Sequence, residues 1–378
     1  MAKYRFDQIA INSTEKKKPA EEDRFTYLGL EHLDSGTLRV TRFGTEVAPV
    51  GEKLVMHKGD VLFGKRRAYQ KKVAIAPFDG IFSAHGMVLR PKEDVIDKVF
   101  FPLFISSDYF LDAAIKISVG SLSPTINWRD LKELEFELPD MDTQRKLAEV
   151  LWSINDTMEA YKKLLSATDE LVKSHFIDMF GDPSANTLGW PEMRLEDACI
   201  KLTDGTHFSP ESFATGEYKY ITAKHIKADG FDFSNLTYVP EAIHRPIFER
   251  CNPEYGDILY IKDGATTGIA MINTLKEEFT MLSSVALIKY NRHLLDGQYL
   301  KALLNYPTFY AIMRNNMGGA AITRLTVKKL CDTLIPVPPI DNQKQFSAFV
   351  GQSDKSKFAI QCCSNLNLWS GSVSQIIM

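Results

Sequence analysis

The strongest constraint on the fold is that the chain repeats itself. Residues 120–147 align with 319–346 without a gap at a constant offset of 199 residues. Upstream, GDVLF at 59–63 matches GDILY at 256–260 at an offset of 197. A change of offset between matching segments indicates short insertions in loops, where insertions disturb a fold least. The sequence therefore predicts two copies of one architecture, against the alternative that short strands match by chance.

Each copy combines short strand-like runs with one helical stretch. The runs are VLFG, AIAPF and MVLRP in the first copy and DILYI, IAMIN and VALIKY in the second, separated by Gly, Pro and Asp. A helix is predicted near 99–117 in the first copy and near 298–315 in the second. Each copy is thus expected to be a mixed α+β globule.

A long helix is predicted after each globule. The first, over 141–180, carries an apolar seam at alternating spacings of four and three residues, which is typical of a coiled coil. The seam residues are Leu147, Leu151, Ile154, Met158, Tyr161, Leu165, Thr168, Val172, His175 and Met179. About 38 helical residues span roughly 57 Å at 1.5 Å per residue, more than a small domain needs.

The second helix, predicted over 340–378, has a less regular seam, and Gly351 and Gly371 weaken it. Its apolar positions are Phe346, Val350, Phe358, Cys362, Leu366, Trp369, Val373 and Ile376. The expected organisation is a first globule over 1–140, the first helix over 141–180, a linker and second globule over 181–339, and the second helix over 340–378. Antiparallel pairing of the helices would relate the two halves by a pseudo-twofold axis and hold the globules apart.

Composition indicates a folded protein without a membrane span. Of the 378 residues, 44% are hydrophobic and 25% charged, unlike the polar make-up of disordered chains. The longest apolar run, 99–105, is far shorter than the roughly 20 residues that cross a bilayer. The amino end lacks the apolar core of a secretory signal, so a cytoplasmic location is expected. The five cysteines include no Cys-x-x-Cys pair, which argues against a disulfide framework and a zinc site.

The common catalytic constellations are missing from the sequence. Asn252-Pro253-Glu254-Tyr255 resembles the base-binding loop of adenine methyltransferases but has glutamate where a second proline belongs. The 30 residues after Pro139-Asp140 contain no Glu-x-Lys or Asp-x-Lys, as a nuclease of that type requires, and there is no phosphate-binding P-loop. The eight histidines lack ligand spacing. We therefore expect a binding protein with no catalytic residues, no metal site and no cofactor of its own.

A local basic patch points to DNA as the ligand. The net charge is only −3, but residues 57–72 hold six Lys or Arg against one Asp. Side chains directly after the GDVLF run can bind phosphates and guanine edges, and the candidates are Lys65, Arg66, Arg67, Tyr69 and Lys71. A solvated hairpin would explain the same charges. The second copy has Lys262, Thr266 and Thr267 at this place, so the two copies are expected to read different sequences.

Several segments, in order along the chain, resemble one known family. They are LGLEHLDSGTL and GDVLFGKRRAYQKKVAIAPFDGIFSAHGMVLRP in the first copy, DGTHFSP, YITAKHI and GDILYIKDGATTGIA in the second, and the starts of the two long helices. Over essentially its full length the chain resembles the specificity subunit of type I restriction-modification systems. Matching motif positions add Thr206, His207 and Lys224 to the DNA-contact candidates. The first copy departs from the pattern, because it offers Ile11-Asn12-Ser13-Thr14 where the second has Asp-Gly-Thr-His.

The resemblance implies a non-catalytic subunit with two target recognition domains, each contacting half of a split site in double-stranded DNA. It further implies that the helices set the spacer and dock two modification subunits, which hold S-adenosylmethionine and methylate adenine. Restriction subunits using ATP and Mg would join them. Two other classes stay open at this point: a self-sufficient modification or nuclease enzyme, and a coiled-coil adaptor that joins proteins without binding DNA.

Overall fold

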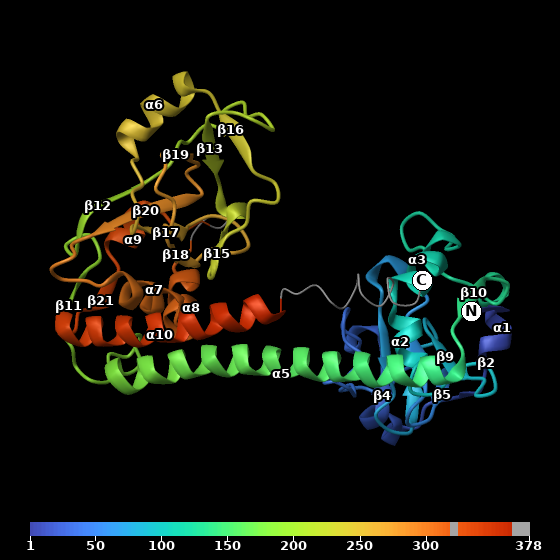
Figure 1. Ribbon diagram of the computed structural model, residues 1–378. Coiled ribbons are helices and arrows are strands. Elements are labelled where there is room, and N and C mark those ends of the chain that lie inside the picture. Colours follow the sequence, from blue (N-terminus) through green and yellow to red (C-terminus); the bar gives the residue numbers. More distant parts are fainter. Residues whose placement is uncertain (318–323, 365–378) are drawn as a thin grey trace. The chain divides into compact units, whose positions relative to one another are not determined.

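The computed structural model describes residues 1–317 and 324–364, with side chains to residue 357 (Figure 1). One compact unit lies within Met1–Lys162 and a second is formed by Lys163–Ile360. Each unit has its own apolar core, and each combines sheets with helices. The expected mixed architecture, present twice, is thus confirmed.

The first unit holds two four-stranded sheets and one two-stranded pairing. The strands of the first sheet, in spatial order, are β2 (Ala10–Ser13), β9 (Met87–Pro91), β6 (Val61–Phe63) and β7 (Val73–Ile75). Those of the second are β3 (Lys16–Lys17), β5 (Lys53–Met56), β8 (Gly80–Phe82) and β4 (Tyr27–Leu28). β1 (Ala2–Arg5) pairs with β10 (Glu135–Leu138), and the helices are α1 (Phe6–Ile9), α2 (Phe101–Ser106), α3 (Asp108–Lys116) and α4 (Trp128–Leu131).

The second unit has the same main sheet and two smaller ones. The main sheet has, in spatial order, β12 (Cys199–Asp204), β20 (Val285–Tyr290), β17 (Ile258–Ile261) and β18 (Ala270–Ile272). Smaller sheets join β16 (Thr237–Val239), β13 (Tyr218–Ile221) and β19 (Phe279–Met281), and β14 (Ile226–Lys227) with β15 (Gly230–Phe231). β11 (Glu192–Arg194) pairs with β21 (Leu334–Pro336), and the helices are α6 (Glu241–Arg250), α7 (Gly297–Asn305), α8 (Pro307–Asn315) and α9 (Val327–Cys331).

Strand register shows that the two main sheets are copies of one another. Leu62 lies opposite Val88 in the first unit, as Leu259 lies opposite Leu287 in the second. The same register runs into the edge strands β2 and β12, where Asn12 faces Leu89 and Leu202 faces Ile288. Counting along each strand, Thr14 occupies the position of Asp204, and Lys65 the position of Lys262.

The prediction of one helix near 99–117 and one near 298–315 is wrong. The structure has two short helices in each place, α2 and α3 in the first unit and α7 and α8 in the second. In the first unit α2 ends before Ser107, which has an extended backbone and whose hydroxyl caps α3 by accepting from the Phe110 N–H at 3.3 Å. In the second unit Pro307 begins α8 and, lacking an N–H, cannot continue α7, while Tyr306 before it is extended.

The predicted long helices are present as α5 (Met141–Phe180) and α10 (Ile340–Ser364). The continuation predicted over 365–378 lies outside the described residues. In the second unit, His175 packs on Phe349 at 4.1 Å between ring centroids, and Asp169 forms an ion pair with Lys357. Because the contacts move back along α5 as they advance along α10, the two helices run antiparallel there (Figure 1).

The apolar seam of α5 packs against the first core near one end of the helix and against the second core near the other. Leu147 and Leu151 pack into the first core, and Val172 packs against the second. The seam residues between these ends are half-buried and comprise Ile154, Met158, Tyr161 and Leu165.

A buried glutamine fixes the start of each long helix. Gln144 Oε1 accepts a hydrogen bond from Asp97 N–H at 2.8 Å, and its Nε2 donates to the carbonyls of Val95 and Pro139 at 3.2 and 2.9 Å. Gln343 makes the equivalent bonds in the second unit at 2.8, 2.9 and 2.8 Å. These glutamines align in the sequence repeat, so the junction between globule and helix is duplicated as well.

Candidate nucleic-acid interface

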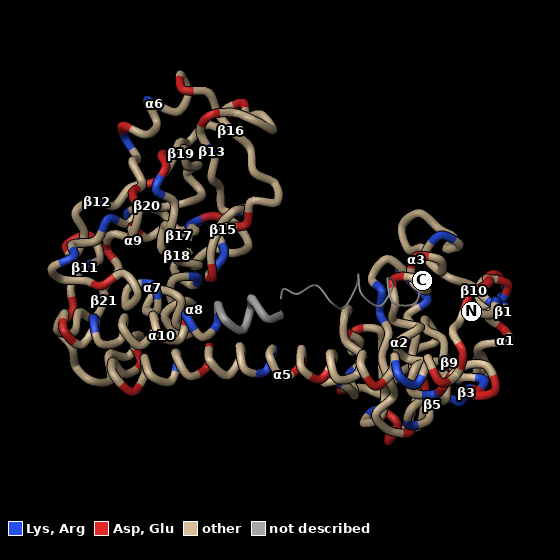
Figure 2. The backbone as a smooth tube through the Cα atoms, in the orientation of Figure 1, with Lys and Arg blue, Asp and Glu red and all other residues tan. Residues whose placement is uncertain are grey.

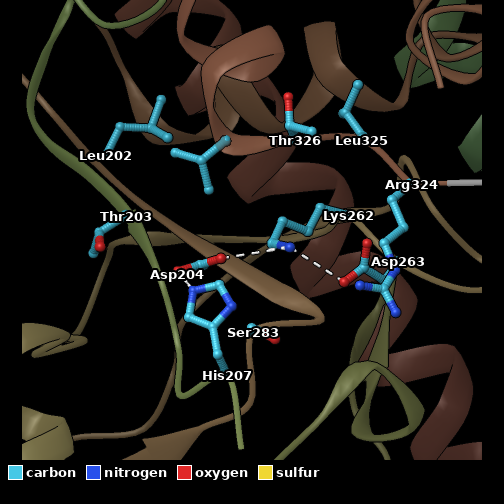
Figure 3. Close-up of a pocket in the computed structure, with 11 residues that line it drawn as sticks. Leu202, Thr203, Asp204, His207, Lys262, Asp263, Ser283, Arg324, Leu325 and Thr326 are labelled. Atoms are coloured by element: carbon cyan, nitrogen blue, oxygen red, sulfur yellow. Dashed lines mark hydrogen bonds and ion pairs between the residues drawn. The ribbon is translucent and has the colours of Figure 1, made fainter. Parts of the chain in front are cut away.

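The second unit carries a crevice, lined by charged and apolar side chains, at one end of its main sheet (Figure 3). It measures about 410 Å³ and is lined by residues 202–204, His207, Lys262, Asp263, Ser283 and 324–327. The end of β12, the loop after β17 and the segment leading into α9 bring these residues together. We call it the second crevice.

Ion pairs fill the centre of the second crevice. The Lys262 ammonium lies 3.4 Å from Asp204 and 3.2 Å from Asp263, and its side chain is only 8% exposed. Figure 3 shows it pointing between the two carboxylates, with Arg324 beside Asp263. His207 and Arg250 approach Asp204 at 3.2 and 3.5 Å. Lys262 is therefore neutralised by side chains of its own unit.

The first unit carries the equivalent crevice, which we call the first crevice. It measures about 300 Å³ and is lined by residues 12–14, Lys16, Leu54, Lys65, Gly86, Met87 and 126–128. The backbone that builds it is the same: Ile126 N–H donates to Lys65 O at 2.9 Å, as Leu325 N–H donates to Lys262 O at 3.0 Å. None of its described lining residues is acidic. Burial and, secondarily, the charge of Lys16 lower the pKa of Lys65.

The next candidates of the first unit, Arg66, Arg67 and Tyr69, have exposed side chains. Arg66 is exposed and reaches His85 Nε2 at 3.4 Å. Burial and then the charge of Arg66 lower the pKa of His85, so that imidazole is favoured in its neutral form. Arg67 is exposed with a left-handed backbone, φ 54°, and the Tyr69 ring is 57% exposed.

Lys71 is held by two carboxylates of α3. Its ammonium lies 2.7 Å from Asp108 and 2.8 Å from Asp112. Burial acts to lower the pKa of Lys71, but the hydrogen bonds to the two aspartates outweigh it and raise the pKa above its ordinary value. Lys71, which the sequence suggested as a DNA contact, thus stabilises the turn after β6 through its ion pairs with α3.

The candidates of the second unit lie around the second crevice and on neighbouring loops. Thr206 is buried, and its backbone N–H donates to Met281 O at 2.8 Å. Thr267 is fully buried, with its hydroxyl donating to Gly264 O at 2.8 Å, whereas Thr266 is exposed. His207 and Lys224 are exposed as well. The structure brings Lys262 and His207 together at Asp204.

Sequence reasoning missed Asp204, Asp263 and Arg324 as members of the site. In the sequence repeat, Arg324 is the counterpart of Thr125, 199 residues earlier. The antiparallel β-bridge between Asp263 and Arg324 in the second unit corresponds to the one between Arg66 and Thr125 in the first. The repeat therefore carried a signal for Arg324, which lies inside the aligned segment 319–346. Asp204 and Asp263 differ in charge from their counterparts Thr14 and Arg66, so the repeat alone did not mark them.

Along the backbone of both units, Lys and Arg positions are interleaved with Asp and Glu positions (Figure 2). Within the described ranges, no three His, Cys, Asp or Glu residues gather as metal ligands, and no helix is long and apolar enough to cross a membrane. The thiols of Cys199, Cys251 and Cys331 are free, and burial raises the pKa of the first two to about 12.

Comparison with known proteins places both copies in one family. The model of the type I restriction modification DNA specificity domain matches residues 15–167 and 188–362. The EcoDI specificity subunit of Escherichia coli is 29% identical over 41% of this chain and 35% of its own length. The MjaIX specificity subunit of Methanocaldococcus jannaschii is 24% identical over 69% of this chain and 63% of its own length. The matches thus span about a third and somewhat under two thirds of these curated relatives.

A solved structure shows the same fold. The crystal structure of the S subunit of a type I restriction-modification system from M. genitalium superimposes with a TM-score of 0.57. The superposition covers 99% of this chain and 93% of that one, at 16% sequence identity. The likeness therefore extends over both units and both long helices as far as they are described.

Proposed function

Because this chain belongs to the family of type I restriction modification DNA specificity domains, we propose that it is the DNA-recognition subunit of a type I restriction-modification complex. Each globule reads one half of a bipartite site in double-stranded DNA. The observation that carries the proposal is that the family match falls on both copies, whose equivalent crevices differ in charge. One scaffold with two unlike surfaces suits a target whose halves differ in sequence.

The proposed division has four parts. Residues 1–140 are the first target recognition domain, 141–180 the first central helix, 181–339 the linker and second recognition domain, and 340–378 the second central helix. The DNA-contact residues are those proposed from sequence, with the exposed Arg66, Arg67 and His207 reaching outward. Lys262, paired with Asp204 and Asp263, shapes the second crevice from within, and Lys71, Thr206 and Thr267 support the loops that carry the others.

The chain itself performs no catalysis in this proposal. Its helices set the spacer between half-sites, about one DNA turn or roughly 34 Å apart, and dock two modification subunits. Those subunits bind S-adenosylmethionine and methylate adenine, and restriction subunits supply ATP- and Mg-dependent cleavage. The complex works in the cytoplasm.

Mapping methylated adenines across the source genome, with and without this gene, tests the proposal. We expect loss of methylation at one bipartite, non-palindromic sequence when the gene is deleted. A gel-shift titration of the chain with a duplex carrying that sequence should show affinity that falls with salt. An unchanged methylation map together with no duplex binding would favour a protein adaptor and contradict the proposal.

A further inference from the structure

The two crevices hold the same lysine in opposite electrostatic settings. Strand register places Lys65 and Lys262 at equivalent positions, and Thr14 at the position of Asp204. In the second crevice the Asp204 carboxylate lies 3.4 Å from the Lys262 ammonium. In the first crevice a neutral threonine takes its place. The second unit thus supplies an internal anion that the first unit lacks.

Lys65 has no anionic partner of its own. It makes no ion pair and no side-chain hydrogen bond with any residue that the structure describes, although it is only partly exposed. Its surroundings add positive charge, because Lys16 lines the same crevice and Arg66 follows it in the chain. Burial and the Lys16 charge lower the pKa of Lys65, the direction expected for an ammonium without a counter-charge.

The walls of the first crevice suit an oxyanion. Asn12, Ser13 and Thr14 line it beside Lys65 and contribute an amide and two hydroxyls, and Asn127 contributes a second amide. These groups can donate hydrogen bonds to phosphate oxygens around the ammonium. At about 300 Å³ the crevice has room for a phosphate group with its attached sugar atoms.

We propose that the first crevice is an anion subsite that takes one backbone phosphate of the bound DNA, and that Asp204 closes the equivalent subsite in the second unit. The inference rests on the proposed function and deepens it, because it makes the two recognition domains unequal in how they hold the DNA backbone. The first domain binds one phosphate more than the second at this position, and Lys65 contributes to affinity rather than to base discrimination.

A carboxylate at position 14 would reproduce in the first crevice the arrangement of Asp204 beside Lys262 in the second. The test uses the full-length chain, the mapped target duplex and binding titrations between 50 and 200 mM salt. Thr14→Asp and Lys65→Gln should each flatten the slope of log affinity against log salt by about 0.9, the value for one phosphate contact. The control for charge is Thr14→Asn, which has nearly the shape of aspartate and replaces a hydroxyl donor with an amide donor. Its salt slope, rather than its absolute affinity, should equal that of the wild type.

A second arm identifies the anion as a DNA phosphate. Neutral methylphosphonates are placed one at a time along the half-site read by the first domain. One substitution should weaken wild-type binding by a factor that is about 3.5 times larger at 50 mM than at 200 mM salt, the ratio expected when one phosphate contact is lost. The same substitution should leave Lys65→Gln binding unchanged, because the contact is already lost.

The outcomes separate this inference from the proposed function. A wild-type chain that fails to bind the duplex contradicts the proposed function. Wild-type binding with an unchanged slope in Thr14→Asp overturns the inference alone, as does a duplex on which no methylphosphonate affects binding. If Lys65→Gln changes base preference in the first half-site while the salt slope stays the same, Lys65 reads a base and the inference is wrong.

Discussion

The Lys289 ammonium lies 2.8 Å from Asp257 in the interior of the second unit, where the two residues are 9% and 5% exposed. The first unit holds its equivalent, Arg90, whose guanidinium binds both oxygens of Asp60 at 2.8 and 2.9 Å. In each unit this pair joins the turn before the central strand to the neighbouring strand. Burial raises the pKa of Asp257, and Lys289 opposes that rise.

Removing Lys289 should destabilise the second unit strongly. Lys289→Met leaves the Asp257 carboxylate buried without its counter-charge, and we expect a loss of about 3 kcal/mol in the free energy of unfolding. Chemical denaturation followed by tryptophan fluorescence measures it. Lys328→Met on the exposed face of α9 is the control and should cost little. Equal stability of the two variants would contradict the prediction.

Replacing the junction glutamines should loosen one unit at a time. Gln144→Ala removes three hydrogen bonds and leaves the Asp97 N–H without its partner, at an expected cost of about 1–3 kcal/mol. Hydrogen exchange should accelerate at the start of α5 and leave the start of α10 unchanged. Gln343→Ala should give the reverse pattern, so each variant is the control for the other.

Arg66 and Lys71 should separate binding from stability. Arg66→Ala should weaken DNA binding by about 1–3 kcal/mol if the guanidinium donates two hydrogen bonds to a base edge. The loss should be smaller if the guanidinium contacts only a phosphate. Lys71→Ala should affect thermal stability more than affinity, because Asp108 and Asp112 already hold the ammonium. Binding at moderate salt and a melting curve for each variant check both statements. An Arg66→Ala variant with wild-type affinity would leave the patch a solvated turn.

His244 should make the second unit less stable in mild acid. Its ring is fully buried, stacked on Tyr218 at 3.8 Å, and burial lowers its pKa from 6.5 despite the opposing effect of Glu278. The unfolded chain therefore binds a proton more readily, and the free energy of unfolding should fall as the pH drops below about 6.5. His244→Gln should flatten this fall, and His293→Gln at an exposed site should not. Identical pH profiles for His244→Gln and the wild type would refute the assignment.

Shortening α5 should shorten the DNA spacer. Deleting residues 159–162 removes four residues, or about 6 Å of helix at 1.5 Å per residue, which corresponds to roughly two base pairs. Methylation of a library with variable spacers should shift to shorter spacers while both half-sites stay the same. An unaltered spacer preference would show that the helices do not set it.

The sequence repeat was enough to predict the duplicated sheets and both long helices, since apolar periodicity and loop breakers are local signals. It did not reveal that Ser107 and Pro307 each divide a helix, although the proline was visible and its effect on Tyr306 is a general one. The second crevice depends on contacts between residues far apart in the sequence, such as Asp204 and Lys262, which are 58 positions apart, and no local pattern encodes such contacts. Lys71 was suggested as a DNA contact from its charge alone. Its ion pairs with Asp108 and Asp112 of α3 exist only in the folded chain and are not visible in the sequence.

The two crevices are framed by main-chain hydrogen bonds at Lys65 and Lys262, which involve no side-chain atoms. Substitutions on their walls can therefore change what each surface recognises while the frame stays intact. Such a construction lets a few point mutations in the walls create a new surface chemistry without the need to evolve a new fold.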